Sequence, residues 1–389
     1  MLARRLLLLG GVSAPAAAWA SQGSAGAWAW LLGITLGWVL VRFRFGFSGP
    51  LRRAITGRDP RVLHPLALLV LVLVLGSAVV IGLAGPLGLP LDLAEAPLRP
   101  SLAAGAFLFG IGMQLAGRCG SGTLASAAQP EGGFGLTLAA LLVGVFAGSL
   151  HRPLIERATP AGWPPVSLLA HLPLGLAVLV QLGILALLLA LLHLLWRHPL
   201  RPPEPEASAA PFEADQLVGA GALGLAMLLL LLFTGDLWRV LWGLALTAAH
   251  LAQAAGWDSS QSAFWGSPAR QQLLASPLQW IRHPAVVINL GVIYGAVLAR
   301  SWWPRQRSGH SRPGGLPPNR HRMLAQAIGG LLMGYGGFLS YGCNISSFLG
   351  GVISFSLHGW VWLLAAFAGS ITWLRLARSP LLRQWLPGG

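Results

Sequence analysis

The sequence contains no lysine, and acidic residues are scarce. All 26 cationic side chains are arginines, against 11 Asp and Glu in 389 residues. Charged residues make up only 10% of the chain and hydrophobic residues 55%, whereas a soluble domain carries about 25% charged residues. The arginines lie between long apolar runs, as in the positively charged loops of a membrane protein. The net charge of +15 therefore does not indicate a nucleic-acid partner.

Cysteine is nearly absent as well. Cys119 and Cys343 are the only two, and both lie in apolar surroundings. Their spacing matches neither a disulfide framework nor a zinc site, although a bridge between the two stays open. The sequence predicts neither a metal nor another cofactor.

Both cysteines occupy the same position of an internal repeat. At a constant offset of 224 residues, five positions of the first copy recur in the second: Gly105, Gly110, Gly112, Leu115 and Cys119 match Gly329, Gly334, Gly336, Leu339 and Cys343. Each cysteine ends a glycine-rich apolar run of about fifteen residues, shorter than the span of about 20 that crosses a bilayer. Paired short segments of this kind indicate the binding site of a transporter.

A small polar break follows each cysteine. Non-helical backbone at membrane depth is stable only where protein buries it or where it lines a polar cavity. A short helix beginning near Thr123 would offer free N–H groups and a partial positive charge to an anion. Thiols are soft, weak donors, so an anion with a terminal sulfur suits them better than phosphate or carboxylate, which favour arginine forks. The candidate site residues are Cys119, Gly120, Ser121, Gly122, Thr123, Cys343, Asn344 and Ser346, together with Arg118.

Three features near the cysteines have two readings each. Arg118 is the only arginine inside a predicted membrane element, where it either draws anions inward or snorkels to a nearby interface. The glycine pattern Gly330-x3-Gly334 also serves close helix packing. His358 begins the last apolar segment, as an interfacial residue or as a proton relay.

The apolar runs predict an all-α polytopic membrane protein with two pseudo-symmetric halves. It would have about 8–9 transmembrane helices plus two re-entrant pairs of short helices that carry the cysteines. Residues 1–26 form an N-terminal tail or signal-like segment, and residues 375–389 a C-terminal tail. A single membrane domain spans 27–374: half one is 27–150, connecting helices are 167–255, and half two is 286–374.

Arginine-rich loops stay on the cytoplasmic side of a membrane, which fixes the expected topology. Three loops qualify: Arg42–Arg61, the loop with Arg152 and Arg157, and Arg300–Arg322. Each cysteine segment is treated as a hairpin that returns to the side where it began. This arrangement leaves Arg375, Arg378 and Arg383 on the opposite side, against the rule.

With these residues the chain resembles the YeeE/YedE family, whose members carry a sulfur-transport domain and take up thiosulfate or related compounds. The motifs are Gly110–Leu124, Gly334–Ile345 with Ser356–Trp360, and Arg44–Gly49. The resemblance implies an hourglass of re-entrant helices in which Cys119 and Cys343 pass thiosulfate onward through S–H···S hydrogen bonds. Two positions depart from the family: Gly46 stands where some members have a third cysteine, and Arg118 where Gly is common.

The sequence thus favours a permease of the bacterial inner membrane, without enzymatic activity. Its partners would be thiosulfate or a related sulfur anion, the lipid bilayer, and a cytoplasmic sulfur-carrier protein. Two alternatives stay open. The first alternative is a membrane thiol enzyme that passes sulfane sulfur or electrons through a Cys119–Cys343 couple. The second is a structural membrane subunit without transport. No Ser/His/Asp set indicates hydrolysis.

Overall fold

The computed structural model describes residues 23–126, 134–159, 162–196, 206–302 and 320–379, together with Gly11. Most of the predicted N-terminal segment, 1–26, and residues 380–389 of the predicted tail lie outside these ranges. The regular secondary structure of the described residues is all helical, with no β-strand and only isolated bridges such as Pro97–Pro165. The prediction of an all-α fold is confirmed.

The helices follow one another along the chain without a second domain type. They are α2 (Ser24–Arg42), α3 (Ser48–Gly57), η2 (Pro60–Leu63), α4 (His64–Leu87), α5 (Pro100–Ala116), α6 (Gly120–Ser126), α7 (Phe134–Ala158), α8 (Leu174–Leu195), α9 (Glu206–Thr234), α10 (Val240–Ala254), η3 (Ser259–Gln261), α11 (Pro268–Leu274), α12 (Pro277–Arg282), α13 (Pro284–Trp302), α14 (Arg320–Leu339), the π-helical turn η4 (Asn344–Leu349), α15 (Gly350–Ile353) and α16 (His358–Leu376).

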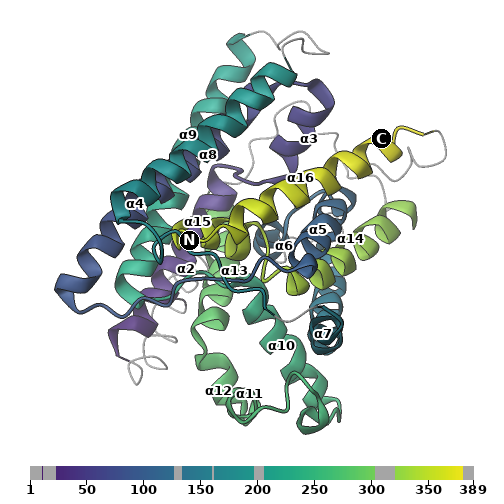
Figure 1. Ribbon diagram of the computed structural model, residues 1–389. Helices are drawn as coiled ribbons and strands as arrows, with labels where there is room; N and C mark the ends of the chain where they lie inside the picture. The colour runs from purple at the N-terminus through teal and green to yellow at the C-terminus, as the bar shows by residue number, and fades with distance from the viewer. Residues whose placement is uncertain are drawn as a thin grey trace.

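Nine segments among the described residues are long and apolar enough to cross a membrane. They lie on α2, η2–α4, α5–α6, α7, α8, α9, α13, α14–α15 and α16, so the chain is a multi-pass membrane protein. Their burial separates a core from a periphery. On α8 only 11% of the apolar stretch is buried inside the protein, whereas on the α5–α6 and α14–α15 segments 61% of it is buried. Apolar side chains that the protein leaves uncovered, as on α8, face lipid. Helices α5 and α14, on the two most buried segments, pack against each other beside α7 and α16 (Figure 1).

Helices α5 and α14 cross at glycines. A Cβ atom on Gly105 would overlap the carbonyl oxygen of Gly336, and a Cβ on Gly336 would overlap that of Gly105. Gly112 and Gly329 repeat this mutual contact about two turns away. Such close backbone approach needs residues without side chains. The packing interpretation of Gly330-x3-Gly334 holds as well, since a Cβ on either glycine would overlap a carbonyl oxygen of α7.

The helices on either side of this crossing make equivalent contacts. Gly334 on α14 lies against the carbonyl of Leu141 on α7, and Gly110 on α5 lies against that of Ala366 on α16. Helices α7 and α16 begin at residues 134 and 358, which differ by 224, the offset of the repeat. These reciprocal contacts favour a pseudo-symmetric relation between the two cysteine-bearing units. The symmetry stays a prediction, as does the re-entrant course of the second hairpin.

The helix ends gather at two faces. At one, which we call the Arg58 face, Arg42 pairs with Asp215 at 3.5 Å and the ring of His64 stacks on His193. Arg375 and Arg378, at the end of α16, line a pocket with Arg58 at this face. The conflict predicted for these two arginines therefore disappears, since they lie with the Arg42–Arg61 loop; Arg383 lies outside the described residues.

The opposite face, called the Arg152 face, corrects the expected topology. Glu156 on α7 pairs with Arg152 at 2.9 Å and with Arg99 at 3.4 Å, so Arg152 does not share a face with Arg42–Arg61. The reason is that α5 passes through the bundle. It begins after Arg99 and ends just before Gly117, whose carbonyl accepts a hydrogen bond from Ser48. The first cysteine segment thus does not return to the side where it starts.

Candidate functional site

Cys119 lies in the break between α5 and α6 and is 2% exposed. The chain turns at Gly117, whose φ of 76° is left-handed and favours glycine. The Cys119 carbonyl then accepts the N–H of Thr123 at 2.8 Å. Its sulfur accepts the N–H of Gly122 at 3.4 Å and lies 3.4 Å from the hydroxyl of Ser121. The thiol therefore caps the first turn of α6 and has a hydroxyl beside it.

Cys343 has an equivalent setting at the start of η4 and is fully buried. Its N–H donates to Oγ of Ser346 at 3.0 Å, and that hydroxyl in turn donates to the Cys343 sulfur at 3.6 Å. The Cys343 carbonyl accepts the N–H of Ser347 at 2.8 Å. Gly342 is required before it, because its φ is 153° and a Cβ there would overlap Ser346 Oγ. Each sulfur therefore has a nearby serine hydroxyl.

The two breaks meet in the interior of the bundle. A Cβ atom on Gly120 would lie 3.4 Å from Cβ of Cys343 and 3.7 Å from its sulfur. Asn344, on the second break, donates its side-chain N–H to the sulfur of Met113 on α5 at 3.7 Å. The structure thus brings together the two segments that carry the predicted site residues, which lie more than two hundred positions apart in the chain.

Two polar atoms at this meeting point have no hydrogen-bond partner among the described residues. They are Oγ1 of Thr123 and Oδ1 of Asn344, on residues that are 0% and 5% exposed. An unsatisfied buried polar group costs about 1–3 kcal/mol, so native proteins keep few of them and each calls for an explanation, such as an unseen water or ion. Two side-chain atoms near the thiols therefore have capacity for a further hydrogen bond.

Arg118 ties the two ends of the first break together. Its Nη1 donates to Oγ of Ser126 at 2.6 Å, and the residue is half-buried. Neither of the two predicted readings, an anion attractor or a snorkelling cation, anticipated this bond. A packing role for Arg118 is thus established beside whatever its charge contributes.

Sequence reasoning missed a group of polar residues on the Arg58 side of the first break. Arg52 on α3 donates to Oε1 of Gln114 at 3.2 Å, and Ser48 donates to the carbonyl of Gly117 at 3.0 Å. Burial lowers the pKa of the Arg52 guanidinium below its ordinary value. The signal was Gln114 itself, a polar residue inside an apolar, glycine-rich run. The Arg44–Gly49 element is thereby placed directly against the Cys119 segment, with open space around the Cβ position of Gly46.

The Cys343 segment is held by indole groups for which the sequence predicted no role. Trp362 on α16 donates to Oγ of Ser340 at 3.0 Å, and Ser347 donates to the Ser340 carbonyl at 2.8 Å. Gln181 on α8 links Trp360 to the carbonyl of Val352. His358 is buried and lies 2.8 Å from Ser356 Oγ, at the start of α16 as predicted.

Known proteins are similar to this chain in sequence. The sequence profile described as sulphur transport matches residues 42–372. "Thiosulfate transporter TsuA" of Spirochaeta thermophila is 28% identical over 370 residues, which cover 90% of this chain and 98% of that protein. "Probable transporter YedE" of Escherichia coli and of Salmonella typhimurium is 29% identical over 150 residues.

The last two matches are partial. They cover 39% of this chain, and the chain spans about a third of each YedE protein, 34% of its length. The family profile, in contrast, includes both cysteines, the two breaks and all but the first and last of the nine candidate spans in full. The chain therefore belongs to the sulphur transport (YeeE/YedE) family.

Proposed function

We propose that this protein is a permease of the bacterial inner membrane that carries thiosulfate past Cys119 and Cys343. The observation that carries the proposal is the meeting of the two cysteine breaks at Gly120 and Cys343 inside the bundle. Similarity to a thiosulfate transporter over 90% of the chain supports the choice of substrate. The Arg58 face, with most of the arginine-rich loops, is then cytoplasmic, and a sulfur-carrier protein would receive the cargo there.

The chemistry of the meeting point suits an anion that has both a sulfur and oxygens. A thiol is a weak, soft donor, and the S–H groups of Cys119 and Cys343 donate in turn to the terminal sulfur of thiosulfate. The hydroxyl of Thr123, unpartnered in the described structure, donates to an oxygen at the other end. Hydrogen bonds to a charged acceptor are worth about 1.5–3 kcal/mol each, enough to replace part of the water that the anion leaves behind. No covalent bond forms.

A growth and mass experiment tests this proposal against its two rivals. A bacterial strain without thiosulfate uptake should grow on thiosulfate as sole sulfur source when it expresses this protein, and the purified protein should keep its unmodified mass after exposure to thiosulfate. A persulfide or disulfide adduct in the intact mass would show a thiol enzyme instead. Absence of growth, with the protein present in the membrane, would favour the alternative that the chain is a structural subunit without transport.

Arg118 is expected to raise the local concentration of the anion through its charge. Arg118→Ala should therefore raise the KM for thiosulfate several-fold while membrane abundance stays near wild type. Ser126→Ala is the matched control, since it removes the hydrogen bond at 2.6 Å but keeps the charge, and its KM should stay unchanged. An equal rise of the KM in both variants would mean that Arg118 acts only through its hydrogen bond to Ser126.

Gly120 sets the space between the two breaks. Gly120→Ala adds one methyl group at an ordinary contact distance of 3.4 Å from Cys343 Cβ, so transport should stay within about twofold of wild type. Gly120→Val extends branched methyl groups toward the Cys343 sulfur, and its maximal uptake rate should fall at least about tenfold. Initial uptake rates at saturating thiosulfate, normalised to protein in the membrane, provide the measurement; equal rates for Val and Gly would contradict the path.

A further inference from the structure

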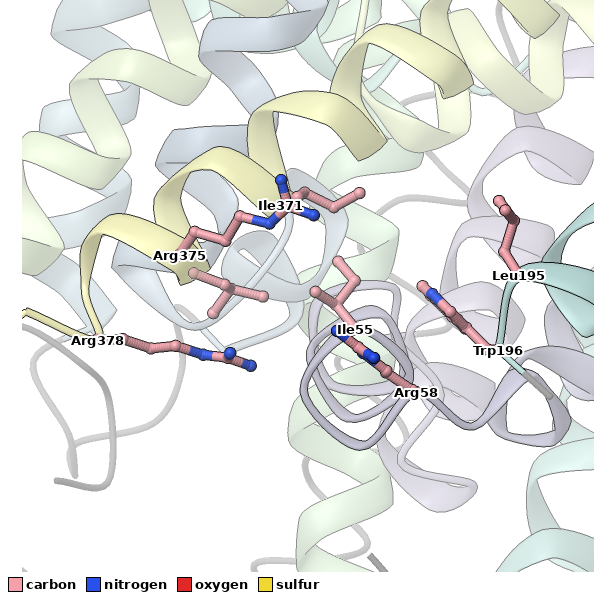
Figure 2. Close-up of a pocket in the computed structure, with 8 residues that line it drawn as sticks. Ile55, Arg58, Leu195, Trp196, Ile371, Arg375 and Arg378 are labelled. Atoms are coloured by element: carbon pink, nitrogen blue, oxygen red, sulfur yellow. The ribbon is translucent and has the colours of Figure 1, made fainter. Parts of the chain in front are cut away.

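A pocket of about 310 Å³ lies at the Arg58 face, away from both cysteine segments. The side chains around it come from the ends of three helices: α3 supplies Ile55 and Arg58, α8 supplies Leu195 and Trp196, and α16 supplies Ile371, Leu374, Arg375 and Arg378 (Figure 2). The three elements are far apart in sequence. Nothing in the proposed transport path uses this pocket.

The polar part of the lining has a single sign of charge. Arg58, Arg375 and Arg378 all contribute, and none of the described residues that line the pocket is acidic. None of the three guanidinium groups forms an ion pair or a hydrogen bond with the described part of the chain. Elsewhere at this face arginines are matched, as Arg42 is by Asp215 and Arg61 by Asp59. Three unmatched arginines around one cavity form a binding site for an anion, and for phosphate in particular.

The apolar part of the lining identifies the kind of anion. Five of the eight lining residues are Ile, Leu or Trp, a poor wall for a small hydrated ion. The pocket also opens where α8 leaves its leucines uncovered: Leu187, Leu191, Leu194 and Leu195 are 45–67% exposed. Trp196, at the end of α8, is a residue type that anchors at the headgroup level of a bilayer. The arginines of the pocket therefore suit a phosphate group, and its apolar lining and the exposed leucines of α8 suit acyl chains.

We propose that this pocket binds the headgroup of an anionic phospholipid, whose acyl chains lie along α8. The phosphate occupies the space between Arg58, Arg375 and Arg378, and the lipid comes from the leaflet at the Arg58 face. Basic pockets between transmembrane helices at the cytoplasmic side are suited to such headgroups. The bound lipid joins the ends of α3, α8 and α16, and so braces the helix that packs on the Cys119-bearing unit. This inference is independent of the proposed function.

Native mass spectrometry of the full chain in detergent tests the lipid site. The probes are palmitoyl-oleoyl phosphatidylglycerol and the phosphatidylcholine with the same acyl chains. Wild type should retain phosphatidylglycerol in preference, and the triple variant Arg58→Gln/Arg375→Gln/Arg378→Gln should lose this preference at least tenfold. The control triple variant Arg157→Gln/Arg320→Gln/Arg322→Gln removes the same charge from exposed residues outside the pocket and should bind as wild type does.

Two further arms make the outcome decisive. If the pocket triple variant is not monodisperse, the single Arg→Gln variants are used in its place. Each should weaken the binding of phosphatidylglycerol about fivefold, since a basic residue near an anionic lipid surface is worth about 1 kcal/mol. Millimolar thiosulfate or inorganic phosphate should not displace the lipid from wild type. Displacement by either, or equal lipid retention by the pocket and control variants, would overturn the proposal; the first result would assign the pocket to a free anion.

Discussion

Cys343→Ser and Cys343→Ala should each stop thiosulfate uptake, and the same substitutions at Cys119 should do so independently. Serine nearly keeps the volume of cysteine but replaces a soft thiol by a hard hydroxyl, so a change in transport reports on the sulfur rather than on packing. Each break provides one thiol at the meeting point, so neither can replace the other. Loss of one charge-assisted hydrogen bond, about 1.5–3 kcal/mol, corresponds to a roughly ten- to hundredfold slower step.

The control for these variants is a buried small polar residue away from the breaks. Ser77 on α4 is fully buried and its hydroxyl donates only to the carbonyl of Val74; Ser77→Ala should transport at the wild-type rate. Rates are compared per folded protein, measured as monodisperse protein from membranes. Near wild-type uptake by Cys343→Ala would mean that the residue only fills space.

Gly110→Val and Gly334→Val should prevent stable folding. A Cβ on Gly110 would overlap the carbonyl oxygen of Ala366, and one on Gly334 that of Leu141. Because both neighbours are helix backbone, they cannot rotate away as a side chain would, and the helices must separate. Even ordinary overpacking of a core costs about 1–3 kcal/mol, and separating a core helix pair costs further contact.

The same substitution on the lipid-facing helix provides the matched control. Gly183 on α8 is exposed, and nothing lies within 4 Å of its Cβ position, so Gly183→Val should leave the Tm in detergent within about two degrees of wild type. The Tm of the two core variants should fall by about ten degrees or more, or the protein should be absent from the membrane. Similar Tm values for all three variants would show that α5 and α14 do not depend on their glycine contacts.

The local features of the site were readable from the sequence because they depend on residues close together in the chain. A cysteine followed by small polar residues after a glycine-rich run predicted a break, and the structure has breaks at Cys119 and Cys343. The repeat offset of 224 paired the two before any contact was known. The reciprocal glycine contacts of α5 and α14 follow from the same pattern, since two copies of a small-residue face pack well against each other.

The topology was not readable, because it depends on how far a helix travels. A glycine-rich run of about fifteen residues looks too short to cross a bilayer, yet α5 extends from Pro100 to Ala116 and passes through the bundle. That single crossing moves Arg152 to the opposite face, where Glu156 pairs with both Arg152 and Arg99. The positive-inside rule counts arginines and takes no account of whether an acidic residue pairs with them.

Partners distant in sequence were also out of reach. Arg52 and Gln114 are bonded across α3 and α5, and Gln181 joins α8 to α15 and α16. Each is a single polar residue in an apolar setting, which signals a buried hydrogen bond but does not name the acceptor. Only the packing of the helices decides which carbonyl or amide lies opposite.

Uptake of radiolabelled thiosulfate into proteoliposomes of the purified protein is the most direct test of the central claim, that a sulfur anion passes the two thiols. Wild-type protein should accumulate label, with unlabelled thiosulfate competing and sulfate, which lacks the terminal sulfur, competing poorly. The cysteine-free variant Cys119→Ser/Cys343→Ser should accumulate no more label than empty liposomes. Uptake by this folded variant at near the wild-type rate would contradict the account.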